Sequence, residues 1–345
     1  MKKIIPTNDI SKEQKASLLV RVITAIAMAA ICIPCVFLGG WFFFGLIAIV
    51  CIMCGYELVK ITPISGKLRT ALFIITIILV VAICYYVFLK NIILDAKNGE
   101  IDMATYLYKN LISIDISEML FMFAAAVLFI ICFTVEQFKI SYVFYFLSML
   151  IVIPLGLQSF LYLRFLPFTD GVILGQTVGL GFGGITDTSN NIFIYFQSAF
   201  LLLYVVIGVF MNDIGAYFVG IFFGKHKMNP RISPKKTWEG FVGGIVVSII
   251  CSMLWAMLLS AGGYPILPMF DHNHWYFVLI VSVLLPMFGD IGDFVFSAIK
   301  RHFEVKDFSR LLPGHGGMLD RIDSLLFASA LVAGMISFIQ FVGAY

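Results

Sequence analysis

Four aspartates in the last sixth of the chain stand in two pairs with the same spacing. Asp290 is followed by Asp293, and Asp320 is followed by Asp323. Residues three apart share one face of a helix, so each pair would present two carboxylates together. Because clustered carboxylates repel strongly in a low dielectric, a bound cation would stabilise them. Oxygen-only ligands favour a hard ion, and we expect Mg²⁺, which binds through a few carboxylates and substrate phosphates.

Basic residues surround these aspartates and leave a second interpretation open. Each aspartate could simply form an ion pair with Lys300, Arg301 or Arg321, because such pairs also hold helix ends. The sequence PGHGG at residues 313–317 favours an anion site instead, since flexible backbone can wrap an anion with exposed N–H groups. Phosphates and a divalent cation together explain both signs of charge.

A second polar segment, residues 212–239, precedes another apolar stretch. It begins with Asn212 and Asp213, where we expect the preceding span to end, and it finishes with SPKKT at residues 233–237. Hydroxyls and ammoniums just before a helix start favour phosphate binding there. The lysines of this segment could equally be anchors on the cytoplasmic side of a membrane.

The rest of the chain is almost entirely apolar. Its 345 residues are 61% hydrophobic and only 12% charged. Apolar runs near 20 residues are typical of membrane-spanning helices. We therefore predict an all-α, polytopic helical membrane protein with about nine spans, at residues 18–38, 41–55, 70–90, 118–135, 141–163, 192–211, 240–260, 275–295 and 324–343.

The basic residues predict which side of the membrane each loop faces, because lysine and arginine near span ends stay cytoplasmic during insertion. With the N-terminus inside, only Lys90, Lys97, Lys109 and Arg164 of the 23 basic residues face outward. Both polar segments then lie on the cytoplasmic face of the cell (plasma) membrane. The net charge of +3 reflects this topology and the lipid bilayer as partner, and no nucleic-acid-binding module is visible.

Polarity divides the chain into two regions. Residues 1–190 hold about five spans with few ionisable groups, which indicates a scaffold. Residues 191–345 hold the last four spans and both polar segments, which indicates the catalytic region. All seven cysteines fall within apolar spans, where they are expected to pack as small apolar side chains rather than form disulfides.

The segment from Ser297 to Asp323 resembles the signature of the phosphatidate cytidylyltransferases, the CDP-diacylglycerol synthases. The matching residues are SAIKR at 297–301, KD at 306–307 and PGHGGMLDRID at 313–323. Detailed similarity covers roughly residues 208–325. The resemblance implies that CTP and phosphatidic acid are the substrates, that CDP-diacylglycerol and pyrophosphate are the products, and that Mg²⁺ and a second cation take part, in phospholipid biosynthesis.

The resemblance also implies roles for individual residues. The implied metal ligands and catalytic carboxylates are Asp293, Asp320 and Asp323, with Lys300, Arg301 and His315 as further catalytic residues. The implied substrate-binding residues are Asp213, Ser233, Lys236, Thr237, Lys306 and Arg321. One position departs from the pattern, because Phe296 stands where family members commonly have glutamate. Asp290, one turn earlier, is the residue that could compensate.

Two other functions are compatible with a polytopic protein. A transporter would bind a phosphorylated solute near the membrane midplane, but here the acids cluster at one face and the two halves show no matching polarity. An alcohol phosphotransferase that consumes CDP-diacylglycerol would need the patterns DGxxAR and GxxxDxxxD, which this chain lacks. The sequence leaves open the acyl-chain preference, the lipid entry route, the basis of nucleotide selection and whether the protein forms a homodimer.

Overall fold

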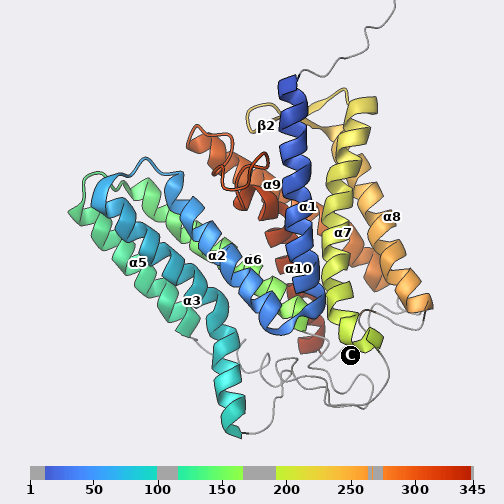
Figure 1. Ribbon diagram of the computed structural model, residues 1–345, viewed down its shortest axis with the longest axis horizontal. Helices are drawn as coiled ribbons and strands as arrows, with labels where there is room; N and C mark the ends of the chain where they lie inside the picture. The colour runs from blue at the N-terminus through green and yellow to red at the C-terminus, as the bar shows by residue number, and fades with distance from the viewer. Residues whose placement is uncertain (1–11, 99–115, 166–191, 263–265, 267–274, 343–345) are drawn as a thin grey trace, which may run out of the picture.

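Long α-helices make up nearly all of the computed structural model, which describes residues 12–98, 116–165, 192–262, 266 and 275–342. The helices are α1 (Lys12–Leu38), α2 (Gly40–Lys60), α3 (Gly66–Asn98), α5 (Ile116–Thr134), α6 (Ile140–Phe165), α7 (Ile192–Phe223), α8 (Trp238–Ala261), α9 (Trp275–His302) and α10 (Leu319–Val342). Strands β1 (Lys227–Asn229) and β2 (Ser233–Thr237) pair as an antiparallel hairpin between α7 and α8. Figure 1 shows this arrangement.

The helices confirm the predicted all-α membrane fold, because each predicted span coincides with one of them. Within the described residues, eight helices are long and apolar enough to cross a membrane. Helix α5 contributes a shorter apolar stretch, Met119–Thr134. The protein is therefore a multi-pass membrane protein, and large apolar side chains such as Phe133 (80% exposed) face outward because lipid is their solvent.

Several predicted spans end too early, and two of these errors concern the polar segments. Helix α7 continues to Phe223 rather than ending near residue 211, so Asn212 and Asp213 lie inside a helix and not in a loop. Helix α9 continues to His302 rather than ending near residue 295. Polar residues can stay helical here because other helices supply their partners: the Asn212 amide donates to the Asp290 carboxylate at 3.0 Å.

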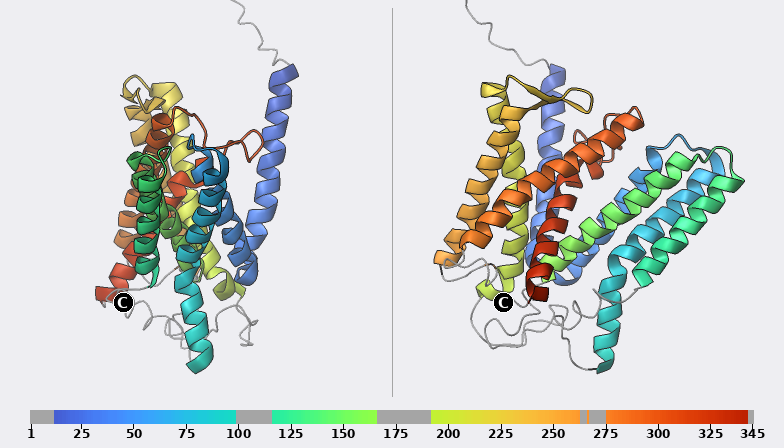
Figure 2. Two further views of the ribbon diagram at one scale, coloured as in Figure 1. Left: turned by 90° about the vertical axis from the view of Figure 1, so that its left-hand side faces the viewer. Right: turned by 180° about the vertical axis from the view of Figure 1, so that it is seen from behind.

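The bundle has two groups of helices joined through α10. Helices α2, α3, α5 and α6 form one group and α7, α8 and α9 the other, and α10 packs against α6 as well as α9 (Figure 2). Glycines allow α7 and α8 to pack closely, since a Cβ at Gly243 would meet Val219 at 2.5 Å and one at Gly215 would meet Val247 at 2.8 Å. Such contacts hold together the two helices that the hairpin connects.

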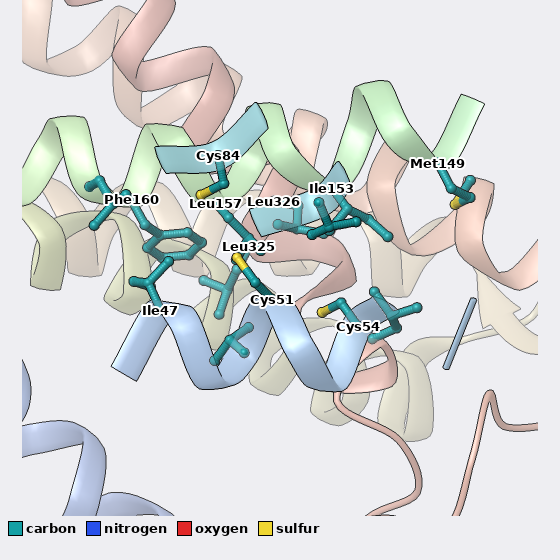
Figure 3. Close-up of a cluster of buried hydrophobic side chains, with 14 of the residues drawn as sticks. Ile47, Cys51, Cys54, Cys84, Met149, Ile153, Leu157, Phe160, Leu325 and Leu326 are labelled. Atoms are coloured by element: carbon teal, nitrogen blue, oxygen red, sulfur yellow. The ribbon is translucent and has the colours of Figure 1, made fainter. Parts of the chain in front are cut away.

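A buried apolar cluster fixes α10 against the first group of helices. Leu325 and Leu326 of α10 pack with Cys51 of α2, Cys84 of α3 and Leu157 of α6 (Figure 3). The cysteines are free thiols, as the sequence predicted, and these two are fully buried. Packing of this kind sets the position of α10 relative to α2, which matters below because the start of α10 belongs to the polar site.

A buried arginine of α6 binds the C-terminal end of α1. Arg164, near the end of α6, donates from Nε to the Val36 carbonyl at 2.6 Å and from a terminal nitrogen to the Phe37 carbonyl at 3.2 Å. These carbonyls belong to the last turn of α1, where helices leave acceptors without intrahelical partners. Gly39, with a φ of 60°, turns the chain into α2 and leaves room for the guanidinium.

Candidate active site

The polar residues gather at one end of the bundle. The hairpin, the C-terminal end of α9 and the loop before α10 all lie there (Figures 1 and 2). Helix α9 ends with Lys300, Arg301 and His302 in its last turn, where cations are favoured by the helix dipole. We call residues 303–318 the α9–α10 loop.

Lys236 of β2 lies between two carboxylates of α9. Its ammonium is 2.7 Å from Asp290 Oδ1 and 2.8 Å from Asp293 Oδ2, and it stands 4.5 Å from the centre of the Phe294 ring. Burial lowers the pKa of Lys236, but the charges and hydrogen bonds of Asp293 and Asp290 outweigh burial and raise that pKa above its ordinary value. Lys236 is therefore a cation at neutral pH.

Asp213 of α7 and Asp323 of α10 complete what we call the aspartate cluster, with Asp290 and Asp293. Asp293 is near enough to both Asp213 and Asp323 for their negative charges to repel. Helices α9 and α10 approach closely at this point, since a Cβ at Gly292 would meet the Asp323 carbonyl oxygen at 2.6 Å. Glycine at position 292 thus brings the carboxylates of two helices together.

The donor chemistry of the aspartate cluster fits a hard divalent cation. Its side chains offer only carboxylate oxygens, and a cation, the Lys236 ammonium, already bridges two of them. Within the described residues, no three His, Cys, Asp or Glu side chains form a ready-made metal cage. Mg²⁺ does not need one, because it commonly takes one or two carboxylates and completes its shell with water and phosphates.

Asp320, the third predicted metal ligand, already has three hydrogen-bond donors. Its Oδ1 accepts from Lys300 Nζ at 2.8 Å, and its Oδ2 accepts from the backbone N–H groups of Phe308 at 2.9 Å and Gly317 at 3.0 Å. Both members of this ion pair are buried, with 11% of the Lys300 side chain and 4% of the Asp320 side chain exposed. Asp320 therefore holds the α9–α10 loop against the end of α9.

The α9–α10 loop presents the other predicted phosphate contacts. Gly314 and Gly316 have φ values of 73° and 87°, which only glycine adopts without strain, so the PGHGG turn needs both. His315 is partly exposed between them, and its carbonyl accepts from Arg321 Nε at 2.9 Å. Lys306 and Arg321 are exposed.

Arg301 contacts the hairpin, and Ser233 is part of it. Arg301 donates to the Ile232 carbonyl at 3.3 Å and to the Val305 carbonyl at 3.1 Å, so its guanidinium links α9 to the hairpin turn. Ser233 is half-buried at the start of β2. The structure thus brings the two polar segments together, as expected from their position beside spans that follow one another.

Thr237 acts as the N-cap of α8. Its hydroxyl accepts from the Gly240 N–H at 3.2 Å, and its side chain is enclosed by Gly220, Gly224 and Gly240. Substrate binding by Thr237 stays a prediction, whereas its capping hydrogen bond is observed in the structure.

We expect Thr237→Ala to destabilise the protein by about 1 kcal/mol, because α8 loses its cap, and Thr237→Ser to retain stability. Thermal unfolding in detergent measures both, and wild-type stability in the alanine variant would contradict the assignment.

Phe296 is part of the apolar packing beside the α9–α10 loop. It is fully buried and packs edge-on against Phe308, with ring centres 5.8 Å apart. The residue at the usual glutamate position therefore contributes to packing of the α9–α10 loop. Asp290, which could compensate, has both carboxylate oxygens engaged, one by Lys236 and one by Asn212.

Two residues near the site were missed in the sequence. Arg21 of α1 lies beside the PGHGG turn, since a Cβ at Gly314 would meet its Cγ at 2.8 Å. Glu57 of α2 reaches the same loop and is fully buried. A carboxylate next to an apolar span was the available signal for Glu57, because such groups are costly in a membrane and are usually functional. The predicted second span ended at residue 55, which left this glutamate in a connection.

The fold and the site define a multi-pass helical membrane protein with carboxylates and lysines from distant helices gathered at one end of its bundle. A family model described as the cytidylyltransferase family matches residues 19–339, and the chain belongs to that family. The sequence resemblance is thereby confirmed at the level of the family.

Curated relatives carry a more specific name. A protein named phosphatidate cytidylyltransferase from Staphylococcus epidermidis is 43% identical over 155 residues, which are 45% of this chain and 54% of the relative. A protein of the same name from Staphylococcus aureus is 44% identical over 155 residues, with the same coverage. The chain spans about half the length of the curated relatives it matches.

Proposed function

We propose that this protein is a nucleotidyltransferase that converts CTP and phosphatidic acid into CDP-diacylglycerol and pyrophosphate. The observation that carries the proposal is the Lys236 ammonium held at 2.7 and 2.8 Å by two carboxylates of α9, with further carboxylates from α7 and α10 beside them. A site with both signs of charge suits a reaction that must bring two phosphate-bearing anions together. Family membership and the name of the relatives support the same reaction.

The chemistry needs charge neutralisation more than it needs a base. An oxygen of the phosphatidic acid phosphate, already ionised near neutral pH, forms the new bond to the α-phosphorus of CTP. The bond from that phosphorus to the bridging oxygen breaks, and pyrophosphate leaves with its electron pair. Positive groups placed around the developing charge stabilise the transition state, which is commonly the largest catalytic contribution.

We assign the metal to part of the aspartate cluster. Asp293 and Asp323 would hold Mg²⁺, with Asp213 beside them, and the ion would neutralise substrate phosphates when bound. Asp320, the third predicted ligand, binds Lys300 and the α9–α10 loop here, and its role as a metal ligand stays a prediction. The second cation that the resemblance implies stays a prediction.

The other predicted site residues would bind the phosphates of the substrates. Lys306 and Arg321 are open to an incoming anion, and partly exposed His315 would donate a hydrogen bond rather than act as an obligatory base. Lys236, whose ammonium lies beside the proposed metal ligand Asp293, would bind a substrate phosphate. Lys300 keeps one ammonium hydrogen on Asp320 and can offer the others to a phosphate.

The proposal includes the orientation of the chain. The hairpin and the α9–α10 loop would face the cytoplasm, where CTP is found, with the N-terminus on the same side. Exposed Lys225, Lys227, Arg231 and Lys235 at this end support that orientation, because basic residues near span ends stay inside. Phosphatidic acid would enter from the bilayer, with its phosphate at the headgroup plane.

The test is pyrophosphate release by the full-length protein with phosphatidic acid, Mg²⁺ and each of the four nucleoside triphosphates in turn. We expect release with CTP at a rate well above that with ATP, GTP or UTP, and formation of CDP-diacylglycerol in equal amount. In sealed membrane vesicles, added CTP should react only where the cytoplasmic face is outward. No release with any nucleotide would contradict the proposal, and transport of a phosphorylated solute without release would favour a transporter.

A further inference from the structure

A carboxylate from the N-terminal region is bound to the loop that precedes α10. Glu57 of α2 has none of its surface exposed, and its Oε1 accepts from Ser309 Oγ at 2.6 Å and from the Met318 N–H at 2.7 Å. Its Oε2 accepts from the Leu319 N–H at 2.8 Å. These contacts join residues more than 250 positions apart in the sequence.

Two of these hydrogen bonds satisfy backbone N–H groups at the start of α10. Helix α10 begins at Leu319, so the Met318 and Leu319 N–H groups have no carbonyl partner within the helix. A carboxylate at a helix N-terminus is stabilised by these N–H groups and by the helix dipole. Glu57 thus caps α10 from another helix, while Asp320 of α10 itself accepts from Phe308 and Gly317.

Glu57 also explains one glycine of the PGHGG turn. A Cβ at Gly317 would meet Glu57 Oε1 at 2.7 Å and Oε2 at 2.8 Å, closer than real Cβ contacts. Gly317 does not have a positive φ, so the need for glycine at this position arises from the approach of the carboxylate and not from backbone conformation.

We propose that Glu57 is a positioning residue that sets the α9–α10 loop and the first turn of α10 for catalysis. This inference rests on the proposed function. Glu57 touches no group that we assign to the substrate, but it holds both ends of the segment that carries His315, from Ser309 to Leu319. Through the start of α10 it also fixes where Asp323 meets Asp293. The N-terminal region therefore contributes a residue to the site and is more than a scaffold.

Neighbouring side chains support a fixed position for the Glu57 carboxylate. On α6, the Tyr145 hydroxyl donates to the Leu58 carbonyl at 3.1 Å and anchors the end of α2 beside Glu57. On the loop side, the Ser309 hydroxyl that donates to Glu57 also accepts from the Leu311 N–H at 3.1 Å. Contacts at α2 and at the loop therefore restrict where the carboxylate can lie. Catalytic geometry depends on such restriction, because displacements of about 1 Å lower rates strongly.

Glu57→Gln is the variant that tests the inference, in the full-length protein reconstituted in lipid nanodiscs. Glutamine keeps the size of the side chain, but its amide replaces one acceptor with a donor and faces an N–H of the first turn of α10. We expect kcat for CDP-diacylglycerol formation to fall by about 10- to 100-fold, with KM for CTP within about threefold of wild type. Amide hydrogen exchange in residues 309–320 should accelerate.

The matched control is Glu136→Gln, the same chemical change at an exposed residue in the turn after α5. It should leave kcat and exchange unchanged. Wild-type kcat together with wild-type exchange in Glu57→Gln would overturn the inference, as would faster exchange with no change in kcat.

Two further arms keep the test decisive. If Glu57→Gln does not fold, Ser309→Ala, which removes one donor to Glu57, must lower kcat by a smaller factor, and an unchanged kcat would overturn the inference. If the wild-type protein forms no CDP-diacylglycerol, the proposed function fails by itself. In that case amide exchange at Met318 and Leu319 still decides whether Glu57 holds the loop.

Discussion

Asparagine in place of Asp323 is expected to reduce transfer from CTP to phosphatidic acid by about 1000-fold, and Asp293→Asn to have a similar effect. Each change removes a negative charge from the aspartate cluster and a ligand from the proposed Mg²⁺ site. The fold should survive, because the Asp323 side chain accepts from the Ser324 N–H through one oxygen, which asparagine retains. Initial rates across a series of Mg²⁺ concentrations measure the effect, and residual activity should need more Mg²⁺ than the wild type.

The control for this pair of substitutions is again Glu136→Gln, which changes charge by the same amount at an exposed position. It should retain full activity with an unaltered Mg²⁺ dependence. Full activity in Asp323→Asn would remove Asp323 from the metal site. A large loss of activity with the wild-type Mg²⁺ dependence would instead assign Asp323 a role in folding or loop position.

Hydropathy predicted where the helices lie but not where the polar ones end. The pattern of apolar residues places a span near each observed helix, because lipid requires a long apolar run. The same reasoning ended α7 at its first polar residues, whereas the helix continues through Asn212 and Asp213 to Phe223. Asn212 has a partner inside the bundle because Asp290 of α9 accepts from its amide. Local hydropathy cannot predict such a pairing between helices.

In the site, too, the sequence predicted which residues share a helix face but not which residues of other helices they contact. Spacing alone indicated that Asp290 and Asp293 share a helix face, and Lys236 indeed contacts both. Spacing suggested the same role for Asp320 and Asp323, yet Asp320 pairs with Lys300 while Asp323 belongs to the aspartate cluster. The spacing of residues along a helix predicts which side of that helix they face. It does not predict the partner that each side chain meets, because that depends on how α9 and α10 pack.

Lys300→Met is expected to destabilise the protein by about 3–5 kcal/mol and to abolish activity, because it leaves the Asp320 carboxylate buried without its cation. The methionine side chain still fills the space of the lysine stem, whose ammonium lies 5.7 Å from the centre of the Phe308 ring. Equilibrium unfolding in detergent gives the change in stability. Asp320→Asn alone should cost less, since the asparagine oxygen can still accept from Phe308 and Gly317.

The double variant Lys300→Met with Asp320→Asn separates the two roles of the lysine. Removing both charges should recover most of the stability, because neither variant side chain leaves an unpaired charge in the interior. Activity should remain at least about 100-fold below wild type, because the ammonium hydrogens that Asp320 does not use are those we assign to a substrate phosphate. A double variant as active as the wild type would reduce Lys300 to a structural partner of Asp320. One that stays as unstable as Lys300→Met would show that the loss comes from packing rather than from an unpaired carboxylate.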